Sequence, residues 1–422
     1  MVEEQNLLVG FDLCNDYSQI ACYNYRTFEP ESICEDLSKE QYLIPTVLGV
    51  TNIKKEWVYG EHAIELGNRG EAFLVYDIVG VIEREEEISI FDVPFTGVDL
   101  LERFLRKCFT LLKKAYPNES IQKIVFTVKE TKSSLIDALR QALNNLKIKE
   151  ERYFIQSHTR SYLLYALSQR RELWANDIGL FDFEESGLKY VQINIKSNTH
   201  PMIAGISQID FSNQLNGPML QRSTDENVRY LLENIIKSAL HNQIISTIYF
   251  TGIGFEGDWA DDLIASLCTG RKVFRGQNLY VKGACYGAKE LIKPKITEDI
   301  LFLTDEVLES DILINAYYNA GISEVYLAKA GEVWKHFSNS IDVILDEEEE
   351  IEIIIRNALT NKETKQMIVL EGILSEPYKC TRIRIRVQLR SQKLCVITVK
   401  DLGFGEFYPT SNRVWEQSVP LE

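Results

Sequence analysis

LVGFDL (8–13) and IGLFDF (178–183) are two apolar segments of the same local shape, and together they decide the fold of this chain of 422 residues. Each has the pattern of a strand, and each carries an aspartate near its end, Asp12 or Asp182. From each segment onward, the hydrophobic periodicity predicts the same order of elements, β-β-β-α-β-α-β-α. Repetition on this scale is more informative than a single motif. We therefore expect two mixed sheets flanked by helices, with both aspartates in a cleft between the halves.

The other elements follow from the spacing of apolar residues. The clearest helix is VDLLERFLRKCFTLLKKAY (98–116), in which leucine and phenylalanine recur every three or four positions. The rest of the first half is predicted to contain strands 17–25, 42–50, 121–128 and 152–156, and helices 133–146 and 159–174. The second half is predicted to contain strands 177–183, 188–195, 202–211, 245–254 and 272–275, and helices 226–242, 258–268 and 284–292.

The composition changes after Pro294, where helical periodicity gives way to alternation of apolar and polar residues. TRIRIRVQL (381–389) is the clearest example, because its apolar side chains all point to one face and its arginines to the other. We therefore predict a separate antiparallel β domain over residues 295–422. The duplicated part divides into one lobe over residues 1–176 and a second over 177–294.

Charge and composition exclude several classes of protein. Apolar residues make up 45% of the chain and charged residues 26%, which is typical of a globular protein. The net charge of −16 repels phosphate backbones and anionic lipids, so neither nucleic acid nor a membrane is an expected partner. The acidic start MVEEQNLLVGFDL argues against a signal peptide, and eight cysteines without a CxxC pair favour a reducing compartment. We therefore expect a cytoplasmic protein.

Several motifs resemble, in the same order along the chain, those of the DnaK-type heat-shock chaperones of the actin-like ATPase superfamily. GFDLCNDYS (10–18) is similar to that family's first phosphate loop, LFDFEESG (180–187) occupies the place of the second, and TGIGFEGDWADDL (251–263) resembles the adenosine loop. KGACYGAKEL (282–291) resembles the closing helix, and ILFLTD (300–305) the acid-flanked linker. The resemblance implies a two-lobed actin-like ATPase fold followed by a peptide-binding β-sandwich.

The resemblance is to a divergent, lid-less bacterial branch of unknown function. The segment 369–401 resembles the family's β-sandwich, but the helical lid that follows it in the family is not expected, because the chain stops within a few residues of Trp415. The tail GFGEFYPTSNRVWEQ (403–417) is expected to pack back on the β domain or else to dock a partner. Only 70 residues separate Asp182 from Gly252, so the subdomain that stacks adenine in the family is expected to be reduced.

Both phosphate loops depart from the family's pattern at the positions that meet phosphate. The family's glycines let backbone N–H groups approach phosphate closely. This chain has instead Cys14, Asn15 and Asp16 in the first loop and Glu184, Glu185 and Ser186 in the second. The acid that orients water in the family corresponds to Ser157, and the lysine near the γ-phosphate to Val79. ATP or ADP with Mg²⁺ is therefore expected to bind weakly or not at all, as in a degenerate ATPase with no catalytic residues.

The residues expected in a nucleotide cleft are the two aspartates and the glycines of the matched motifs. The candidates are Gly10, Asp12, Asp182, Gly252, Gly254, Gly283 and Gly287, with Asp12 and Asp182 as the metal candidates. Two other interpretations stay open, a polar hairpin turn at DFEESG (182–187) and a Mg²⁺ or Ca²⁺ site made of the carboxylates Asp12, Asp182, Glu184 and Glu185. The five histidines are dispersed, which argues against a metal site built on histidine.

Two functions of different class are consistent with these sequence features. The first is a DnaK-like, chaperone-related module that binds a protein or peptide partner and binds nucleotide weakly or not at all. The alternative is an active, ATP-hydrolysing DnaK-type chaperone with atypical cleft residues. The retained aspartate pair favours the alternative, whereas Glu184, Glu185, Ser157 and Val79 favour the first.

Overall fold

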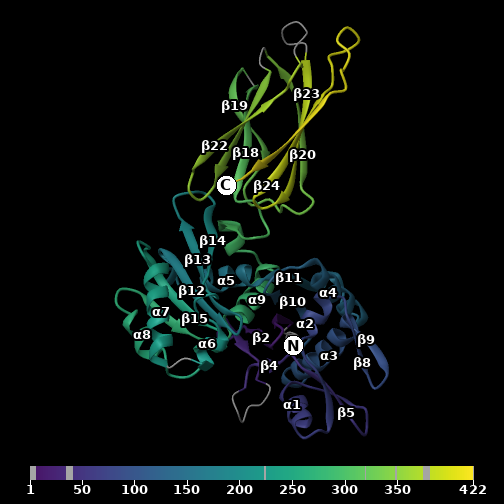
Figure 1. Ribbon diagram of the computed structural model, residues 1–422, viewed down its shortest axis with the longest axis vertical. Helices are drawn as coiled ribbons and strands as arrows, with labels where there is room; N and C mark the ends of the chain where they lie inside the picture. Colours follow the sequence, from purple (N-terminus) through teal and green to yellow (C-terminus); the bar gives the residue numbers. More distant parts are fainter. Residues whose placement is uncertain are drawn as a thin grey trace. The chain divides into compact units, whose positions relative to one another are not determined.

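The computed structural model describes residues 6–34, 41–222, 225–318, 320–346, 349–373 and 381–421, which form a mixed α/β protein (Figure 1). Its contacts divide the chain into two compact units, Met1–Gln192 with Gln208–Glu298, and Ile193–Ser207 with Asp299–Glu422. Of the described helices, none is long and apolar enough to cross a membrane. The described cysteines are all free thiols, and Cys380 lies outside the described residues.

The first unit begins with a mixed sheet covered by helices on both faces. Its elements are β1 (Leu7–Leu13), β2 (Tyr17–Asn24), β3 (Glu29–Ser32), β4 (Ile44–Pro45), β10 (Ile121–Val128), β11 (Tyr153–Ser157), α3 (Gly97–Ala115), α4 (Ser133–Asn145) and α9 (Leu279–Glu290). The strand order is β11-β10-β1-β2-β3, with β1 parallel to β10 and antiparallel to β2, and β4 pairs with β2. Val9 and Phe11 pack into the core with α3 and α4, whereas the alternate residue Gly10 faces α9.

Helix α3 forms where the apolar spacing predicts it. Thr96 caps its first turn by accepting from the backbone N–H of Asp99, and the Asp99 carboxylate accepts from the backbone N–H of Thr96. The apolar stripe of the helix is fully buried in the core of the first sheet.

The chain between β4 and α3 contains short elements, most of which the sequence pattern did not predict. They are β5 (Leu48–Thr51), β6 (Trp57–Tyr59), α1 (Gly60–Asn68), β7 (Ala72–Val75), α2 (Ile78–Glu83), β8 (Glu87–Ile90) and β9 (Val93–Thr96). The strand predicted over 42–50 is divided into β4 and β5, and the backbone N–H of Thr46 between them bonds to the carbonyl of Asp16. Segments this short span too few periods for hydrophobic spacing to identify them.

The second sheet repeats the strand order of the first. Its elements are β12 (Asp177–Glu184), β13 (Gly187–Lys196), β14 (Met202–Asp210), β15 (Ile245–Thr251), β16 (Lys272–Arg275), β17 (Ile300–Leu303), α6 (Gly217–Arg222), α7 (Asp225–Ala239), α8 (Asp261–Ser266) and α10 (Ile296–Asp299). The order β16-β15-β12-β13-β14 corresponds to β11-β10-β1-β2-β3, and β17 pairs with β14. Strand β12 is parallel to β15, as β1 is to β10. Side chains of α7 and α8 pack on Phe181 and Phe183 of β12.

Two helices of the first unit, α9 and α5 (His158–Leu167), lie between the sheet of β1 and the sheet of β12 (Figure 1). Helix α9 packs on β1, β10 and β2, while Tyr162 and Tyr165 of α5 make edge-to-face contacts with Tyr249 of β15. The helix predicted over 159–174 is interrupted, since α5 ends at Leu167 and a 3₁₀ turn follows at Arg171–Trp174. Helix α9 also begins five residues earlier than the predicted start at residue 284.

The second unit contains two antiparallel sheets of four strands that share one hydrophobic core. The strands are β18 (Ser310–Tyr318), β19 (Gly321–Ala328), β20 (Ser338–Leu345), β21 (Glu350–Asn357), β22 (Glu363–Val369), β23 (Thr381–Ser391), β24 (Leu394–Asp401) and β25 (Val414–Pro420). The sheet orders are β19-β18-β21-β22 and β20-β23-β24-β25. In β23 the predicted alternation is confirmed, because Ile383, Ile385 and Val387 are buried and the arginines between them are exposed. The predicted return of the tail is also confirmed, as β25 pairs with β24.

Candidate functional site

The two strand-end aspartates occupy corresponding positions in the two sheets of the first unit. Asp12 of β1 lies opposite Thr127 of β10, and Asp182 of β12 lies opposite Thr251 of β15. Both threonines are buried, and Asp12 is buried beside them. The parallel strand pairs therefore present the two carboxylates at the same end of equivalent ladders.

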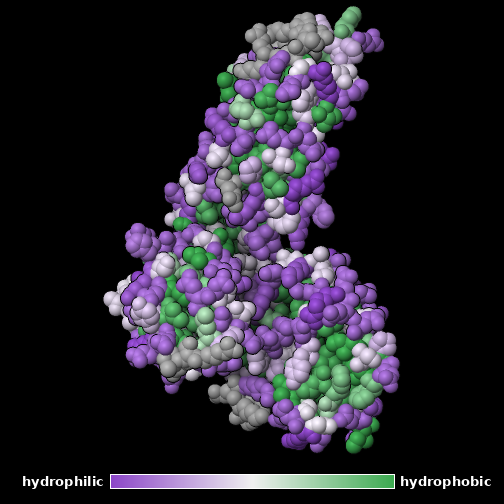
Figure 2. Space-filling model, in the orientation of Figure 1, coloured by the Kyte–Doolittle hydropathy of each residue, from purple (hydrophilic) through white to green (hydrophobic). Residues whose placement is uncertain are grey.

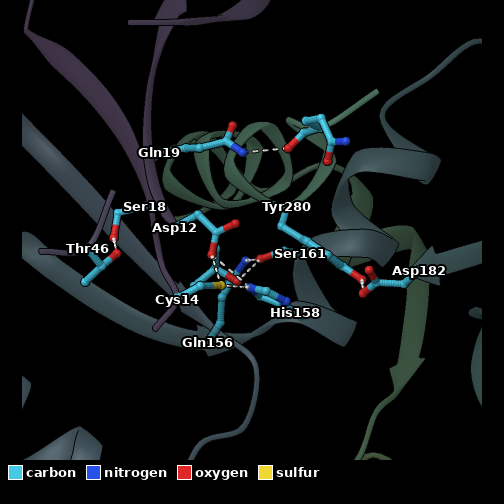
Figure 3. A network of polar contacts seen from close by, with 12 residues as sticks. Asp12, Cys14, Ser18, Gln19, Thr46, Gln156, His158, Ser161, Asp182 and Tyr280 are labelled. Carbon is cyan, nitrogen blue, oxygen red and sulfur yellow. Dashed lines mark hydrogen bonds and ion pairs between the residues drawn. The ribbon is translucent and has the colours of Figure 1, made fainter. Parts of the chain in front are cut away.

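A bridge of side chains engages both aspartates (Figure 3). His158, the first residue of α5, places its Nε2 2.8 Å from Oδ1 of Asp12. The imidazole stacks on the ring of Tyr280 from α9, with ring centroids 3.8 Å apart and planes 14° apart. The Tyr280 hydroxyl donates a hydrogen bond of 2.6 Å to Oδ2 of Asp182. Each aspartate is thus bonded to a protein side chain, and the two side chains are stacked on each other.

Cys14 completes a compact group with Asp12 and His158. Its Sγ lies 3.5 Å from Oδ1 of Asp12 and 3.7 Å from Nε2 of His158. The ligand atoms of the three residues all lie within 4.8 Å of one another. Asp182 is not a member of this group, and the expectation that Asp12 and Asp182 together hold metal-bound water stays a prediction.

Three ionisable side chains at or beside the bridge have raised pKa values, namely Asp182, Glu184 and Cys14. Burial raises the pKa of Asp182, although the Tyr280 hydrogen bond and the charges of His158 and Lys129 work against this shift. Burial and the charge of Asp182 raise the pKa of Glu184 to about 7. Burial and the neighbouring Asp12 also raise the pKa of the Cys14 thiol well above its ordinary value. Burial and mutual repulsion therefore make it unfavourable for all the carboxyl groups of this site to be ionised at the same time.

A small cavity of about 40 Å³ adjoins this group. Asp12, Cys14, His158, Glu184 and Tyr280 are among the residues that line it. A cavity of this size is large enough for an ordered water molecule or an ion.

A larger pocket of about 510 Å³ lies next to the second loop. Its acidic lining residues are Asp16, Asp77, Glu184 and Glu185, and none of its described lining residues is a lysine or arginine. The volume suits a small-molecule ligand. Four carboxylates without a cation in the lining make it a poor site for a polyanion.

The predicted cleft glycines serve close packing in the first unit. A Cβ on Gly10 would lie 2.3 Å from the carbonyl oxygen of Val281, and one on Gly283 would lie 1.9 Å from that of Ser161. A Cβ on Gly287 would lie 3.0 Å from the side-chain oxygen of the buried Gln156. These three glycines let α9 approach β1, β11 and α5 closely. Close packing is therefore sufficient to account for glycine at the three positions.

The two glycines after β15 lie nearer to the candidate site. Gly252 has a φ of 99°, and its N–H and carbonyl bond to the side-chain amide of Gln277 at 3.0 and 2.8 Å. A Cβ on Gly254 would lie 2.4 Å from the ring of Phe183, and this glycine lines the larger pocket. The Gly252 N–H group, a potential phosphate donor, is therefore already bonded within the protein.

Ser157 and Val79 have structural roles in the first unit. The Ser157 side chain caps α5 by accepting from the N–H of Arg160, and Val79 in α2 packs against the hydrophobic core.

His158 and Tyr280 are not among the site residues predicted from the sequence, and Cys14 was predicted only as a departure from the family's glycine. One signal was present, because His158 follows Ser157 directly at the junction of β11 and α5. Strand β11 pairs in parallel with β10, and β10 with β1, so the ends of these strands meet at one edge of the sheet. No comparable signal marks Tyr280, which comes from a helix.

Comparison with known families gives two matches. Residues 29–305 match a family described as "Family of unknown function (DUF5716) C-terminal". Residues 307–421 match a "Domain of unknown function (DUF8552)". No curated protein matches the chain.

Proposed function

The chain belongs to the DUF5716 C-terminal family, whose function is unknown, and we propose that it is a DnaK-related binding protein that does not hydrolyse ATP. In this proposal the first unit has the two-lobed actin-like fold. The strand order shared by the two sheets and the helices α5 and α9 between them support that assignment. The second unit, a β-sandwich, binds a protein or peptide partner.

The observation that carries the proposal is the bridge of side chains between the two aspartates. An actin-like ATPase would need Asp12 and Asp182 to hold metal-bound water. Here Asp12 pairs with His158, Asp182 accepts from Tyr280, and the two rings are stacked. A bound nucleotide would have to break hydrogen bonds to buried charged groups, each worth roughly 1.5–3 kcal/mol.

The larger pocket supports the same conclusion by its charge. Like charges about 4 Å apart repel by roughly 1 kcal/mol in water and roughly 4 kcal/mol at an effective dielectric constant near 20. Glu184 and Glu185 line this pocket where the family has glycines that cradle phosphate. The residues present therefore do not fit a nucleoside triphosphate.

We expect MgATP and MgADP to bind the full-length protein with a dissociation constant no tighter than about 10 μM, which corresponds to roughly 7 kcal/mol. The physical reason is repulsion between phosphate and the carboxylates of Glu184 and Glu185. Isothermal titration calorimetry measures this constant directly.

The double variant Glu184→Gln/Glu185→Gln is the matched variant for that titration, because it keeps the side-chain size and removes both charges. It should bind nucleotide at least about tenfold more tightly than wild type, since relief of about 1.4 kcal/mol suffices. Wild-type binding well below 10 μM would contradict the proposal.

One observation favours the alternative of an active ATPase. The two aspartates occupy equivalent strand ends, and the 510 Å³ pocket beside them has the volume of a ligand site. The alternative predicts phosphate release from ATP that disappears in Asp12→Asn and Asp182→Asn. On our proposal, phosphate release stays at background in wild type and in both variants.

The proposed partner site is at one end of the second unit. The registers place the ends of β18, β20, β22 and β24 at this end, together with the starts of β19, β21, β23 and β25. Figure 2 shows hydrophobic residues on the surface of this unit. Those exposed at this end are Tyr317, Tyr318, Ile322, Ile344, Val369, Phe404, Phe407 and Val414. Residues 374–380, part of the segment that resembles the family's peptide-binding domain, lie outside the described residues.

Tyr317 and Ile322 form the best-defined part of this apolar end. They are directly opposite each other on β18 and β19, and their side chains are 78% and 80% exposed. Contact of such an exposed apolar pair with water is unfavourable, and an apolar surface that covers the pair removes this cost. We therefore propose an extended apolar segment of another protein as the occupant.

We expect the full-length protein to bind apolar peptides with micromolar affinity, and the double variant Tyr317→Ser/Ile322→Ser to bind them at least about tenfold more weakly. Burial of one such side chain contributes roughly 1.5–3 kcal/mol. Fluorescence anisotropy with a library of labelled apolar peptides measures the loss.

Leu394→Ser is the matched control, because Leu394 is also exposed but lies at the opposite end of β24. It should leave peptide binding unchanged. If wild type binds no peptide in the library, or if both variants weaken binding equally, the proposed site is wrong.

A further inference from the structure

Asp12, Cys14 and His158 bring three different metal-ligating atoms to one point in the first unit. The pairs Asp12 Oδ1–His158 Nε2, Asp12 Oδ1–Cys14 Sγ and Cys14 Sγ–His158 Nε2 are 2.8, 3.5 and 3.7 Å apart. Ligands about 2.0–2.3 Å from a tetrahedral Zn²⁺ ion are separated by roughly 3.3–3.8 Å. Two of the three distances already fall in this range, and the third needs to lengthen by about half an ångström.

We infer that Asp12, Cys14 and His158 form a binding site for one divalent transition-metal ion of the Zn²⁺ class. The donor set decides the class of metal. Thiolate and imidazole ligands favour Zn²⁺ and similar ions, whereas Mg²⁺ and Ca²⁺ take oxygen ligands. The inference uses the same cleft as the proposed function but does not depend on the absence of ATP hydrolysis.

Three protein ligands leave a fourth position, and the structure provides space for it. The cavity of about 40 Å³ is lined by all three residues, which is room for a metal-bound water. Glu184 lines the same cavity. Sites with three protein ligands and one open position are the arrangement found in catalytic zinc centres.

A second, independent observation concerns Gln19, which also lines this cavity. Its side chain is only 6% exposed and its Nε2 donates to the carbonyl of Gln277, but its Oε1 has no hydrogen-bond partner among the described residues. A buried acceptor without a donor is costly. An ordered water in this cavity would supply the missing donor.

The surroundings orient the histidine. The Tyr280 ring stacks on His158 and is held in turn by its hydrogen bond to Asp182. Outer contacts of this kind fix the ring of a metal-binding histidine. Asp182 and Tyr280 are positioning residues in this arrangement, and neither ligates the metal.

Cobalt(II) is the probe for the test, because it occupies zinc sites and reports a thiolate ligand by a charge-transfer band in the near ultraviolet. The full-length protein is stripped with a chelator and titrated with Co²⁺ and then with Zn²⁺. We expect one equivalent of Co²⁺ to produce the thiolate band and Zn²⁺ to displace it. Cys14→Ser should lose the band, and Cys14→Ser and His158→Gln should each weaken Zn²⁺ binding at least about 100-fold.

Cys268→Ser is the control, because it removes an exposed free thiol outside the group and should retain the band. Circular dichroism establishes that each variant is folded. A band that persists in Cys14→Ser, or that disappears in Cys268→Ser, overturns the inference. The wild-type titration alone also decides it, because cobalt binding without a thiolate band overturns the site even where a variant does not fold.

The same preparations are titrated with MgATP, which separates this inference from the proposed function. Absence of the thiolate band together with weak nucleotide binding defeats only the metal site. The band together with nucleotide binding tighter than about 10 μM defeats only the proposed function.

Discussion

Replacing Gly283 with alanine is expected to destabilise the first unit by at least about 3 kcal/mol. The added Cβ would lie 1.9 Å from the carbonyl oxygen and 2.6 Å from the carbonyl carbon of Ser161. Both atoms belong to the backbone of α5, so the clash is relieved only if α5 and α9 move apart. Overpacking usually lowers the free energy of unfolding by about 1–3 kcal/mol. The loss at Gly283 should reach or exceed the upper end of this range, because the clashing atoms belong to the backbone and cannot rotate away. Chemical denaturation followed by circular dichroism measures the change.

Gly276→Ala is the matched control in the same unit, because a Cβ there meets only the side-chain oxygen of Asn278 at 3.9 Å. Its effect should stay within about 0.5 kcal/mol. Gly10→Ala should resemble Gly283→Ala, since its Cβ would lie 2.3 Å from the backbone of Val281. A Gly283→Ala protein as stable as Gly276→Ala would mean that the helices are less tightly packed than described.

Glu184 is expected to make the protein less stable as the pH rises from about 4.5 to about 7. Its pKa is raised from 4.5 to about 7, first by burial and then by the charge of Asp182. The folded state therefore holds a proton that the unfolded state has already released, and this contribution to stability is lost as the pH rises through the folded pKa. At about 1.4 kcal/mol for each tenfold change in proton affinity, the loss is at most roughly 3.5 kcal/mol.

Glu184→Gln removes this titration, so the variant should equal wild type near pH 4.5 and exceed its stability by about 2–3 kcal/mol at pH 8. The measurement is urea unfolding of both proteins at several pH values in buffer with a chelator. Glu185→Gln is the control, because Glu185 is adjacent but exposed. A difference between wild type and Glu184→Gln that does not change with pH would show that Glu184 has the same pKa in the folded and unfolded protein.

The elements predicted well are those in which the local pattern of apolar and polar residues shows which side chains are buried. The predicted helix 98–116 agrees with α3 to within one residue at each end, since it has a long apolar stripe and a local cap at Thr96. The alternation in TRIRIRVQL likewise predicted β23, because period-two burial is a local pattern. Helix α9 was predicted to start five residues late, since Gly283 and Gly287 lower helix propensity where contact with α5 and β1 requires glycine.

The candidate site was predicted only in part. Asp12 and Asp182 were identified from the repeated strand, and both are bonded to the bridge of side chains. Their partners were not identified, because His158 is 146 residues from Asp12 and Tyr280 is 98 residues from Asp182. Dispersed histidines argued against a histidine metal site, yet spacing along the chain does not limit which ligands meet in a folded structure.

The sequence by itself determined the longer strands and helices in both halves, the β-rich second unit and the acidic second loop. These properties follow from hydrophobic period and residue type, which are local. Only the tertiary structure decided which side chains meet Asp12 and Asp182. That choice depends on the parallel pairing of β11 with β10 beside β1 and on the close packing of α9 against α5, which bring His158 and Tyr280 into contact. Long-range packing of this kind leaves no periodic signal along the chain, so the bridge and the proposed metal site emerge only in three dimensions.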